Sequence, residues 1–395
     1  MVEVVRRSVL HERHVTLGAK FSTFAGWQMP REYASGLAEH AAVRTACGLF
    51  DVSHLGKVRV RGSGAAAYLN TCLTGDLDRI GAGRAQYTLC CNQSGGIVDD
   101  LIIYRFGDDE LLLVPNAANA SAVAALLTAA APAGIEITDQ HLDFAVLAVQ
   151  GPGSAQLLAA AGLPAGLSYT EFTTAGSAGD VIVCRTGYTG ELGYELIVPV
   201  AQAVAVWDTL LAAGAGPTDP AQAEGAQTGQ VRPCGLSARD TLRTEMGYPL
   251  HGQDITPQIS PLEAGLSWAV GWRKPAFWGR DALLAQREQG PTRKLVGLLA
   301  LEPGVLRAGP ESALQRPATA EQAALAATDP YGPHSIQPPV GRITSGTFSP
   351  TRRVGIALAL VDTDVAIGEQ LIARVRSRHI PVEVVKPPFV DASPK

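Results

Sequence analysis

Two adjacent acids interrupt an otherwise apolar segment of the chain. Asp99 and Asp100 follow the pair Gly95-Gly96 and precede the apolar run 101–103, a pattern typical of a buried strand that begins after a turn. Because neighbouring side chains on a strand point to opposite faces, only one of the two carboxylates faces a given core or cleft. A carboxylate in apolar surroundings needs a partner or a chemical role, such as general acid or base. An aspartate that caps the glycine turn explains the same pattern equally well.

A glycine-rich segment at residues 185–195 offers a second candidate site. Gly187, Gly190 and Gly193 fall within seven residues and would let the backbone approach a ligand closely. Glu191 lies among them, and its carboxylate can accept two parallel N–H donors. The amino-pyrimidinone edge of a pterin or a guanine presents such a donor pair. A hairpin turn with surface acids is the alternative interpretation.

Two further polar segments could serve chemistry or structure. The segment 236–243 predicts a helix that contains Arg239 and Asp240. Arg239 could hold a carboxylate through two parallel hydrogen bonds, or it could form a surface ion pair with Asp240. The segment 344–350, T-S-G-T-F-S-P, indicates a polar turn after a strand, and a structural role is the simpler interpretation there.

Several common catalytic signatures are absent from the sequence. It contains no G-x-x-x-x-G-K-[ST] phosphate loop, no G-x-G-x-x-G after a strand and no H-E-x-x-H, and its eight histidines lack the spacing of metal ligands. The segment 234–239 lacks the last glycine of a nucleophile elbow. These absences count against hydride transfer, ATP chemistry, zinc hydrolysis and serine hydrolysis, and we expect no metal.

Composition narrows the class of protein. The 395 residues include 46% hydrophobic and only 17% charged residues, against about 25% charged residues in a typical soluble domain. The net charge of −5 disfavours a nucleic-acid partner, and no apolar run is long enough for a membrane span. Six cysteines without a C-x-x-C pair indicate a reducing compartment. Since the start of the chain does not resemble a signal peptide, we expect a cytoplasmic protein.

Strands and helices are predicted to alternate up to about residue 290, and the remaining residues are predicted to be mostly β. Strand-like runs occupy 57–61, 97–104, 110–114, 144–149, 181–184, 194–198, 294–300, 354–361 and 370–376. Helices are predicted at 116–130, where Asn116 is available as the cap, and at 153–161, 202–213 and 236–245. The segments 214–235 and 303–340 are rich in Pro and Gly and indicate surface loops, the second with a short helix at 318–327.

Ordered motifs spread over nearly the whole chain, from about His14 to Val390, resemble those of the glycine cleavage system T-proteins, a family of aminomethyltransferases. The motifs are F-A-G-W-Q-M-P at 24–30, L-F-D-V-S-H-L-G at 49–56, G-G-I-V-D-D-L-I-I-Y at 95–104, P-N-A-A-N at 115–119, A-V-Q-G-P at 148–152, R-T-G-Y-T-G-E-L-G-Y-E at 185–195, G-L-S-A-R-D-T-L-R-T-E-M-G-Y-P-L at 235–250, S-P-L-E-A-G-L-S-W-A-V at 260–270, T-S-G-T-F-S-P-T at 344–351 and P-P-F-V at 387–390. Their common order along one chain is far more specific than any single motif.

The resemblance implies an α+β fold of three domains around a central tetrahydrofolate channel. Residues 1–50 and 145–275 would form a discontinuous α/β domain, residues 51–144 a second α/β domain that carries Asp100, and residues 276–395 a β-barrel-like domain. The resemblance also implies a reaction in which an aminomethyl group on the lipoyl arm of an H-protein gives its one-carbon unit to tetrahydrofolate, with release of ammonia. The expected partners are therefore tetrahydrofolate, as a co-substrate, and the lipoylated H-protein.

The resemblance also implies roles for individual residues. Asp100 matches the catalytic aspartate, which would contact the folate nitrogens or the leaving amine, whereas Asp99 should face away and matter less. Glu191 matches the acid that holds the pterin edge, and Arg239 matches an arginine that contacts folate. Other matching positions should line the folate pocket: Leu55, Tyr87, Asn116, Tyr188 and Trp268.

The chain departs from the family pattern in its loops and at its end, and two other interpretations stay open. The segments 214–235 and 303–340 look longer than the family usually carries, and no terminal Tyr follows 388–390. A folate-dependent demethylase of a methylated amine or sulfonium compound would share the scaffold and the pterin contacts, although the intact block at 95–100 and the stand-alone length favour the T-protein. A non-enzymatic folate-binding relative that assists iron–sulfur assembly is disfavoured, because Cys184 is displaced from the position of that group's cysteine.

Overall fold

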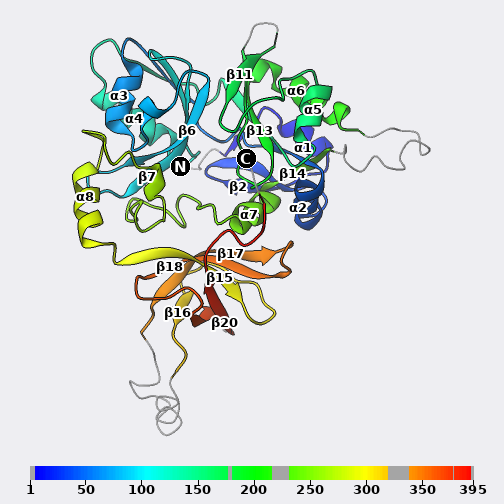
Figure 1. Cartoon of the computed structure of the whole chain (residues 1–395). Helices are drawn as coiled ribbons and strands as arrows, with labels where there is room; N and C mark the ends of the chain where they lie inside the picture. Colours follow the sequence, from blue (N-terminus) through cyan, green and yellow to red (C-terminus); the bar gives the residue numbers. More distant parts are fainter. Residues whose placement is uncertain (1–4, 177–179, 216–230, 319–337, 377, 393–395) are drawn as a thin grey trace. The chain divides into compact units, whose positions relative to one another are not determined.

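The computed structural model describes residues 5–176, 180–215, 231–318, 338–376 and 378–392 (Figure 1). The chain divides into two compact units. The first unit contains Met1–Leu242, Trp268–Ala282 and Ala392–Lys395, and the second contains Arg243–Ser267 and Leu283–Asp391. The domain boundaries expected after residues 50, 144 and 275 stay a prediction. No helix among the described residues is both long and apolar enough to cross a membrane.

The first unit contains a six-stranded sheet assembled from distant parts of the chain. Its strands, in spatial order, are β11 (Phe172–Ala175), β12 (Val181–Cys184), β13 (Gly193–Pro199), β10 (Phe144–Gln150), β4 (Cys47–Asp51) and β14 (Val231–Cys234). All neighbours are antiparallel except β14, which runs parallel to β4. The predicted loop 214–235 is therefore wrong at its end, because residues 231–234 pair with β4 at the edge of the sheet. Residues 216–230 of that loop lie outside the described residues.

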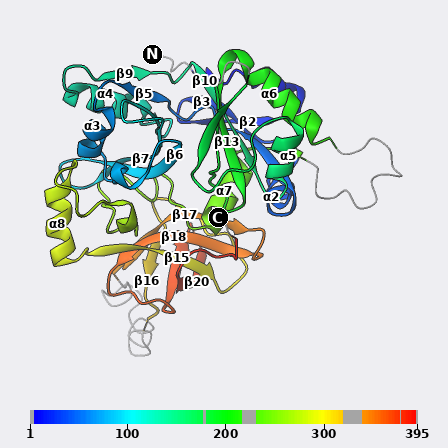
Figure 2. The same ribbon diagram turned by 45° about the horizontal axis from the view of Figure 1, so that its top comes forward.

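Two helices cover one face of this sheet (Figure 2). They are α5 (Ser154–Ala160) and α6 (Val200–Ala213), which pack on β10, β13 and β4. Trp207 of α6 is fully buried in the same core as Leu147 and Leu196 of the sheet. Burying a large apolar side chain stabilises the fold by roughly 1.5–3 kcal/mol. The same core contains Val183 of β12, so it fixes β12 and β13, the strands on either side of the glycine-rich segment.

A five-stranded antiparallel sheet carries the two adjacent acids. Its strands, in spatial order, are β6 (Arg84–Cys91), β7 (Ile97–Arg105), β8 (Glu110–Val114), β5 (Val58–Arg61) and β9 (Glu136–Asp139). The helices α3 (Ala65–Cys72) and α4 (Ala120–Ala130) cover one face (Figure 1). The other face shares a core with the six-stranded sheet, and this core contains Tyr104, Phe50 and Ile182. Apolar packing thus joins the two sheets within the first unit.

The helix α4 begins four residues later than predicted. It starts at Ala120 with Asn119 in the N-cap position, and no side-chain hydrogen bond caps it. Asn116 was the expected cap, but its side-chain amide donates to Asp99 and Asp100 instead. The predicted start was wrong because an asparagine before a helix can bond to other acceptors as readily as to the first turn.

Smaller described elements complete the connections. A three-stranded sheet has the order β1 (Arg6–Arg7), β3 (Trp27–Glu32) and β2 (Lys20–Phe24). The helix α7 (Leu236–Glu245) confirms the helix predicted there, and its Ala238 lies in the core between the two sheets. The other described helices are α1 (His11–Thr16), α2 (Gly36–Thr45), α8 (Arg280–Gln289) and the 3₁₀ helices η1 (Leu77–Arg79) and η3 (Ser267–Ala269).

The second unit contains a closed six-stranded barrel, which confirms the predicted β-rich end of the chain. Its strands, in spatial order, are β15 (Arg293–Ala300), β18 (Val354–Asp362), β17 (Gly341–Ser349), β16 (Ala313–Gln315), β19 (Gln370–Val375) and β20 (Arg378–Val385), and β20 pairs again with β15. The interior is filled with aliphatic side chains such as Leu298, Leu314 and Leu371. The predicted loop 303–340 is too wide, because β16 lies within it. Most of the predicted helix 318–327 lies outside the described residues.

The polar turn predicted at 344–350 is instead part of the strand β17. Its hydroxyl groups are buried, and three of them donate to acids of the same unit. Thr344 and Ser345 donate to Asp254 at 2.5 and 2.7 Å, and Ser349 donates to Glu245 at 2.5 Å. The prediction was wrong because buried hydroxyls that bind buried acids look, in sequence, like the polar residues of a turn.

Candidate functional site

The two adjacent acids lie near the start of β7 and point to opposite faces of the sheet. Asp99 is fully buried, whereas Asp100 is half-buried. The Asp100 carboxylate accepts hydrogen bonds from Asn116 Nδ2 at 2.8 Å and from the Tyr87 hydroxyl at 3.1 Å. Asp99 accepts from the main-chain N–H and Nδ2 of Asn116 and from Nδ2 of Asn119. The two carboxylates therefore share Asn116, although their strand positions separate them.

An aromatic pair lies beside Asp100. The rings of Tyr87, on β6, and Trp268, on η3, stack with 5.2 Å between centroids and 26° between planes, a separation that aromatic pairs favour. Burial and the neighbouring Asp100 raise the pKa of the Tyr87 hydroxyl well above its usual value. Tyr87 therefore remains a hydrogen-bond donor at neutral pH. The Trp268 side chain stays 67% exposed and presents an open indole face.

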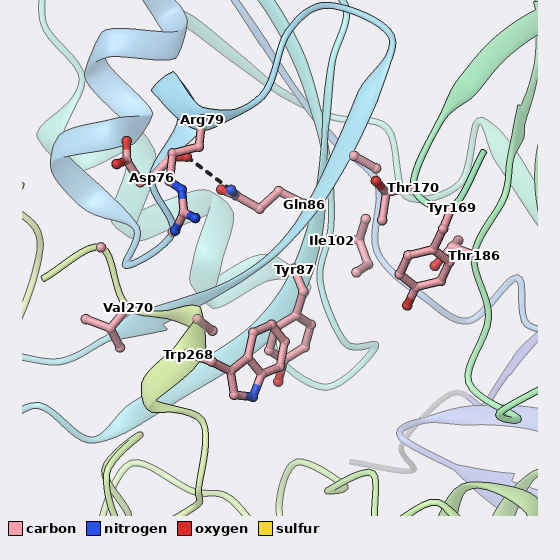
Figure 3. Close-up of a pocket in the computed structure, with 14 residues that line it drawn as sticks. Asp76, Arg79, Gln86, Tyr87, Ile102, Tyr169, Thr170, Thr186, Trp268 and Val270 are labelled. Carbon is pink, nitrogen blue, oxygen red and sulfur yellow. Dashed lines mark hydrogen bonds between the residues drawn. The ribbon is translucent and has the colours of Figure 1, made fainter. Parts of the chain in front are cut away.

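A cavity of about 360 Å³ opens beside this aromatic pair (Figure 3). Tyr87 and Trp268 line one part of it, and Tyr169 and Thr186 line another. The other lining residues are Gly75, Asp76, Arg79, Ala85, Gln86, Ile102, Thr170, Ala269, Val270 and Gly271. The volume lies within the range of small-molecule sites, roughly 300–1,000 Å³. A lining of aromatic rings and a few polar groups suits a planar heterocycle with polar edges.

The buried Gln150 holds the glycine-rich loop in place. Its amide nitrogen donates to the carbonyl oxygen of Thr186 at 3.1 Å, and its amide oxygen accepts from the hydroxyl of Thr189 at 2.7 Å. A Cβ atom at Gly187 or Gly193 would lie 2.0 or 2.3 Å from the Gln150 side chain. Glycine is therefore required at these two positions by contact with Gln150, a reason that the sequence pattern did not reveal.

Glu191 is engaged by an arginine from α2. Arg44 Nη1 lies 2.9 Å from the Glu191 carboxylate and donates to the carbonyl oxygen of Thr189 at 2.8 Å. The Arg44 and Glu191 side chains are only 11% and 18% exposed, so solvent screens this ion pair weakly. The pair attaches the glycine-rich loop to α2. Sequence reasoning missed Arg44 because it lies 147 positions from Glu191.

A second glutamate of the same segment lies closer to Arg239. Glu195, on β13, is buried; burial raises its pKa, and the positive charge of Arg239 opposes that rise. Within the described part of the chain, no hydrogen-bond donor contacts the Glu195 carboxylate. Burial and the charge of Glu195 raise the pKa of Tyr169, which lines the cavity. Sequence reasoning missed Glu195, although an acid inside the apolar strand 194–198 is the signal that identified Asp100.

Arg239 and Leu55 occupy different surroundings. The Arg239 guanidinium lies over the Tyr188 ring, 4.7 Å from its centroid, and Tyr188 is close enough to Tyr87 to raise the pKa of the Tyr87 hydroxyl. Leu55 is half-buried against the core between the two sheets. Its carbonyl oxygen accepts from the buried Lys57 Nζ at 2.7 Å, and burial lowers the pKa of Lys57 to about 7. Lys57 therefore fixes the turn that carries Leu55.

The predicted site residues thus fall into two neighbouring groups and two outlying positions. One group surrounds Asp100 and the other surrounds Arg239, and Tyr188 of the second group is near enough to Tyr87 of the first to influence its pKa electrostatically. Glu191 is paired with Arg44, and Leu55 belongs to a core. Across the described residues, no three His, Cys, Asp or Glu side chains are arranged to hold a metal ion. The arrangement offers a carboxylate for proton transfer beside a pocket for a flat polar ring.

Comparisons with known proteins cover almost the whole chain. Residues 10–274 match the GCVT N-terminal domain, and residues 293–391 match the glycine cleavage T-protein C-terminal barrel domain. The chain is 54% identical to an aminomethyltransferase of Parafrankia sp. (strain EAN1pec), covering 99% of each chain. It is 53% identical to an aminomethyltransferase of Mycobacterium avium (strain 104), covering 96% of each chain. The crystal structure of glycine cleavage system aminomethyltransferase T from Bartonella henselae matches with a TM-score of 0.85 and 33% identity, covering 98% of this chain and 99% of that one.

Proposed function

This chain belongs to the glycine cleavage T-protein family and is an aminomethyltransferase, and we propose that it moves a one-carbon unit from the lipoyl arm of an H-protein to tetrahydrofolate. The aminomethyl carbon leaves sulfur and nitrogen and becomes bonded to two folate nitrogens. The two folate N–H protons then balance the thiol and the ammonia that are released. The reaction therefore needs no oxidant, but it needs a group that moves a proton between folate and the leaving amine.

The observation that carries the proposal is the position of the Asp100 carboxylate. Asn116 and Tyr87 hold it at 2.8 and 3.1 Å, and Tyr87 and Trp268 line the cavity. We assign Asp100 as the catalytic residue that takes a proton from a folate nitrogen and returns it to the departing amine. Asn116 orients this carboxylate, and the Trp268 indole offers a stacking face for folate.

The geometry supports Glu195, in addition to Glu191, as a candidate for holding the pterin edge. The Glu191 carboxylate is paired with Arg44, whereas the Glu195 carboxylate has no described hydrogen-bond donor. A buried carboxylate without a donor is costly, and the paired N–H groups of a pterin would satisfy it. We therefore propose that Glu195 accepts the pterin N–H groups, with Arg239 and Tyr188 beside it, and that Glu191 organises the loop through Arg44.

The test of the function is a reconstituted single reaction. The protein is mixed with tetrahydrofolate and aminomethyl-lipoyl H-protein, and methylenetetrahydrofolate and ammonia are both measured. We expect equal amounts of the two products. Folate binding without either product would contradict the proposal and would favour a demethylase or a non-enzymatic folate-binding protein, which methylated amine substrates then distinguish.

We also propose that the protein works in the cytoplasm, with tetrahydrofolate as a co-substrate and without a metal. The six cysteines are buried and free, which is typical of proteins in a reducing compartment. Measurement of six reactive thiols in the unfolded, freshly purified protein would support this location. A disulfide in the native protein would contradict it.

A further inference from the structure

The Asn116 amide lies between two carboxylates. Its Nδ2 atom is 2.9 Å from Asp99 Oδ1 and 2.8 Å from Asp100 Oδ1, and it also lies 2.9 Å from the main-chain oxygen of Asp100. An amide nitrogen carries two hydrogens and cannot accept. Its two hydrogens are shared among these three acceptors, so the nitrogen end of the Asn116 amide faces Asp100.

Asp99 contacts the Asn116 segment from the opposite face of β7. It is fully buried and stands opposite Cys90 on β6. Besides Nδ2 of Asn116, its oxygens accept from the Asn116 main-chain N–H at 3.0 Å and from Asn119 Nδ2 at 2.7 Å. Both oxygens of Asp99 therefore hold the segment that delivers Asn116 to the site.

We infer that Asp99 is a positioning residue, which acts through the Asn116 amide to orient the Asp100 carboxylate toward the reacting atoms. This inference rests on the proposed catalytic role of Asp100. Asp99 uses both oxygens as acceptors, one for the Nδ2 atoms of Asn116 and Asn119 and the other for the Asn116 main-chain N–H. An asparagine at position 99 would have a single acceptor oxygen, and its amide nitrogen would face the Asn116 main-chain N–H, donor against donor. The segment that carries Asn116 would then move, and its amide would no longer hold Asp100 in its present orientation.

Asp99 and Asp100 also interact electrostatically, in addition to sharing the Asn116 amide. Burial and the charge of Asp100 raise the pKa of Asp99 to about 8. Among the described residues, the other titratable groups that interact with Asp99 are the Cys90 thiol and the Tyr87 hydroxyl. Burial raises the pKa of both; Cys91 and Asp99 raise that of Cys90 further, and Asp100 raises that of Tyr87 further. Interacting acids release their protons in steps that belong to the pair. Asp99 should therefore affect how activity depends on pH, which a purely structural residue would not do.

The first experiment compares Asp99→Asn with Asp281→Asn, a matched loss of one carboxylate at a fully exposed side chain. Turnover is measured with tetrahydrofolate and aminomethyl-lipoyl H-protein, and folate affinity and stoichiometry are measured by calorimetry. We expect Asp99→Asn to lower kcat by roughly 10²-fold, as misplaced catalytic groups do, with full folate stoichiometry and little change in affinity. Turnover equal to that of Asp281→Asn would overturn the inference.

The second experiment tests the route through Asn116. In a double-mutant cycle with Asn116→Ala, the effects of the two changes on kcat should be strongly non-additive, because both act on one contact. The pH–rate profile should lose an inflection near pH 8 in Asp99→Asn. Additive effects, or a profile lowered by the same factor at every pH, would contradict the positioning role.

A milder variant keeps the test decisive if Asp99→Asn does not fold. Asn119→Ala removes one donor to Asp99 and leaves Asn116 in place, and we expect it to shift the pH–rate profile in the same way with a smaller loss of kcat. An unchanged profile in Asn119→Ala would overturn the inference. Failure of the proposed function is distinct, since the unaltered protein would then make no methylenetetrahydrofolate.

Discussion

Two buried carboxylates, one in each unit of this protein, differ in the number of hydrogen-bond donors that contact them. In the second unit, Asp254 accepts hydrogen bonds from Arg243, from the main-chain N–H of Leu250, and from the hydroxyls of Thr344 and Ser345. In the first unit, Glu195 is also buried, but no hydrogen-bond donor among the described residues contacts its carboxylate. The same chemical group is satisfied by protein donors in one place, whereas in the other it is the group that we propose a ligand satisfies.

The difference teaches how to separate structural from functional acids. A carboxylate whose oxygens are filled by protein donors stabilises the fold and has little capacity left for a substrate. A buried carboxylate without donors costs free energy, and that cost is offset only when a ligand supplies donors. Asp100 is intermediate, because Asn116 and Tyr87 donate to its carboxylate and orient it beside the cavity.

The largest expected effect is on turnover. Asp100→Asn removes the group proposed to move a proton, and such groups are worth roughly 10²–10⁴ in rate. We expect kcat to fall within that range while folate affinity changes little. Steady-state assays and calorimetry on the same samples measure the two quantities, and near-normal turnover would remove Asp100 from the mechanism.

Loss of a satisfied acid should affect stability and leave chemistry intact. Asp254→Ala removes the carboxylate that pairs with the buried Arg243 at 2.9 Å, and breaking a buried pair costs roughly 3–5 kcal/mol. We expect a lower urea midpoint and unchanged turnover per folded molecule at low temperature. If turnover falls and the urea midpoint does not, Asp254 has a role beyond stabilising the fold.

The two glutamates of the glycine-rich segment should differ in their effect on folate affinity. Glu195→Gln should weaken tetrahydrofolate binding by about 10- to 100-fold, because a hydrogen bond to a charged group contributes roughly 1.5–3 kcal/mol. Glu191→Gln breaks the ion pair with Arg44 and should lower thermal stability more than affinity. Calorimetric titrations of both variants decide between them, and the reverse order would restore Glu191 as the pterin contact.

The smallest expected effect is the pH dependence of stability. Burial raises the folded-state pKa of Glu195 above its unfolded value. The contribution of protonated Glu195 to the free energy of unfolding is therefore fully present below the unfolded-state pKa. It is lost as pH rises through the folded-state pKa. We expect Glu195→Gln to gain stability relative to the unaltered protein as pH rises above about 4, where the glutamate ionises in the unfolded chain. Parallel curves of unfolding free energy against pH would show that ligand-free Glu195 is well solvated.

Sequence reasoning succeeded where a local pattern carried the information. Alternating or apolar runs predicted β7, β13 and β18, and the segment 236–245 predicted α7 correctly, because burial on one face imposes a period on the residues. Acids in an apolar strand indicated Asp99 and Asp100 as candidates, and the resemblance to the family selected Asp100. The same signal was available for Glu195, but the neighbouring glycines drew attention to Glu191.

The remaining features depend on residues that meet only in the folded chain. The pairing of Arg44 with Glu191 spans 147 positions, and the demand for glycine at Gly187 comes from the Gln150 side chain. The strand β14 is too short for its pattern to be distinguished from a loop, and it forms because β4 offers a free edge. Such contacts are set by tertiary packing, which overrides local preference.

The Trp268 indole beside the cavity provides an intrinsic fluorescence signal for binding. Trp268 is 67% exposed, whereas Trp27 and Trp207 are 5% and 0% exposed, so a molecule that enters the cavity changes the polarity around Trp268 first. Emission from this side chain should therefore follow filling and emptying of the cavity in real time, without a label and without turnover. A Trp268→Phe variant would supply the background emission of the other four tryptophans for such kinetic records.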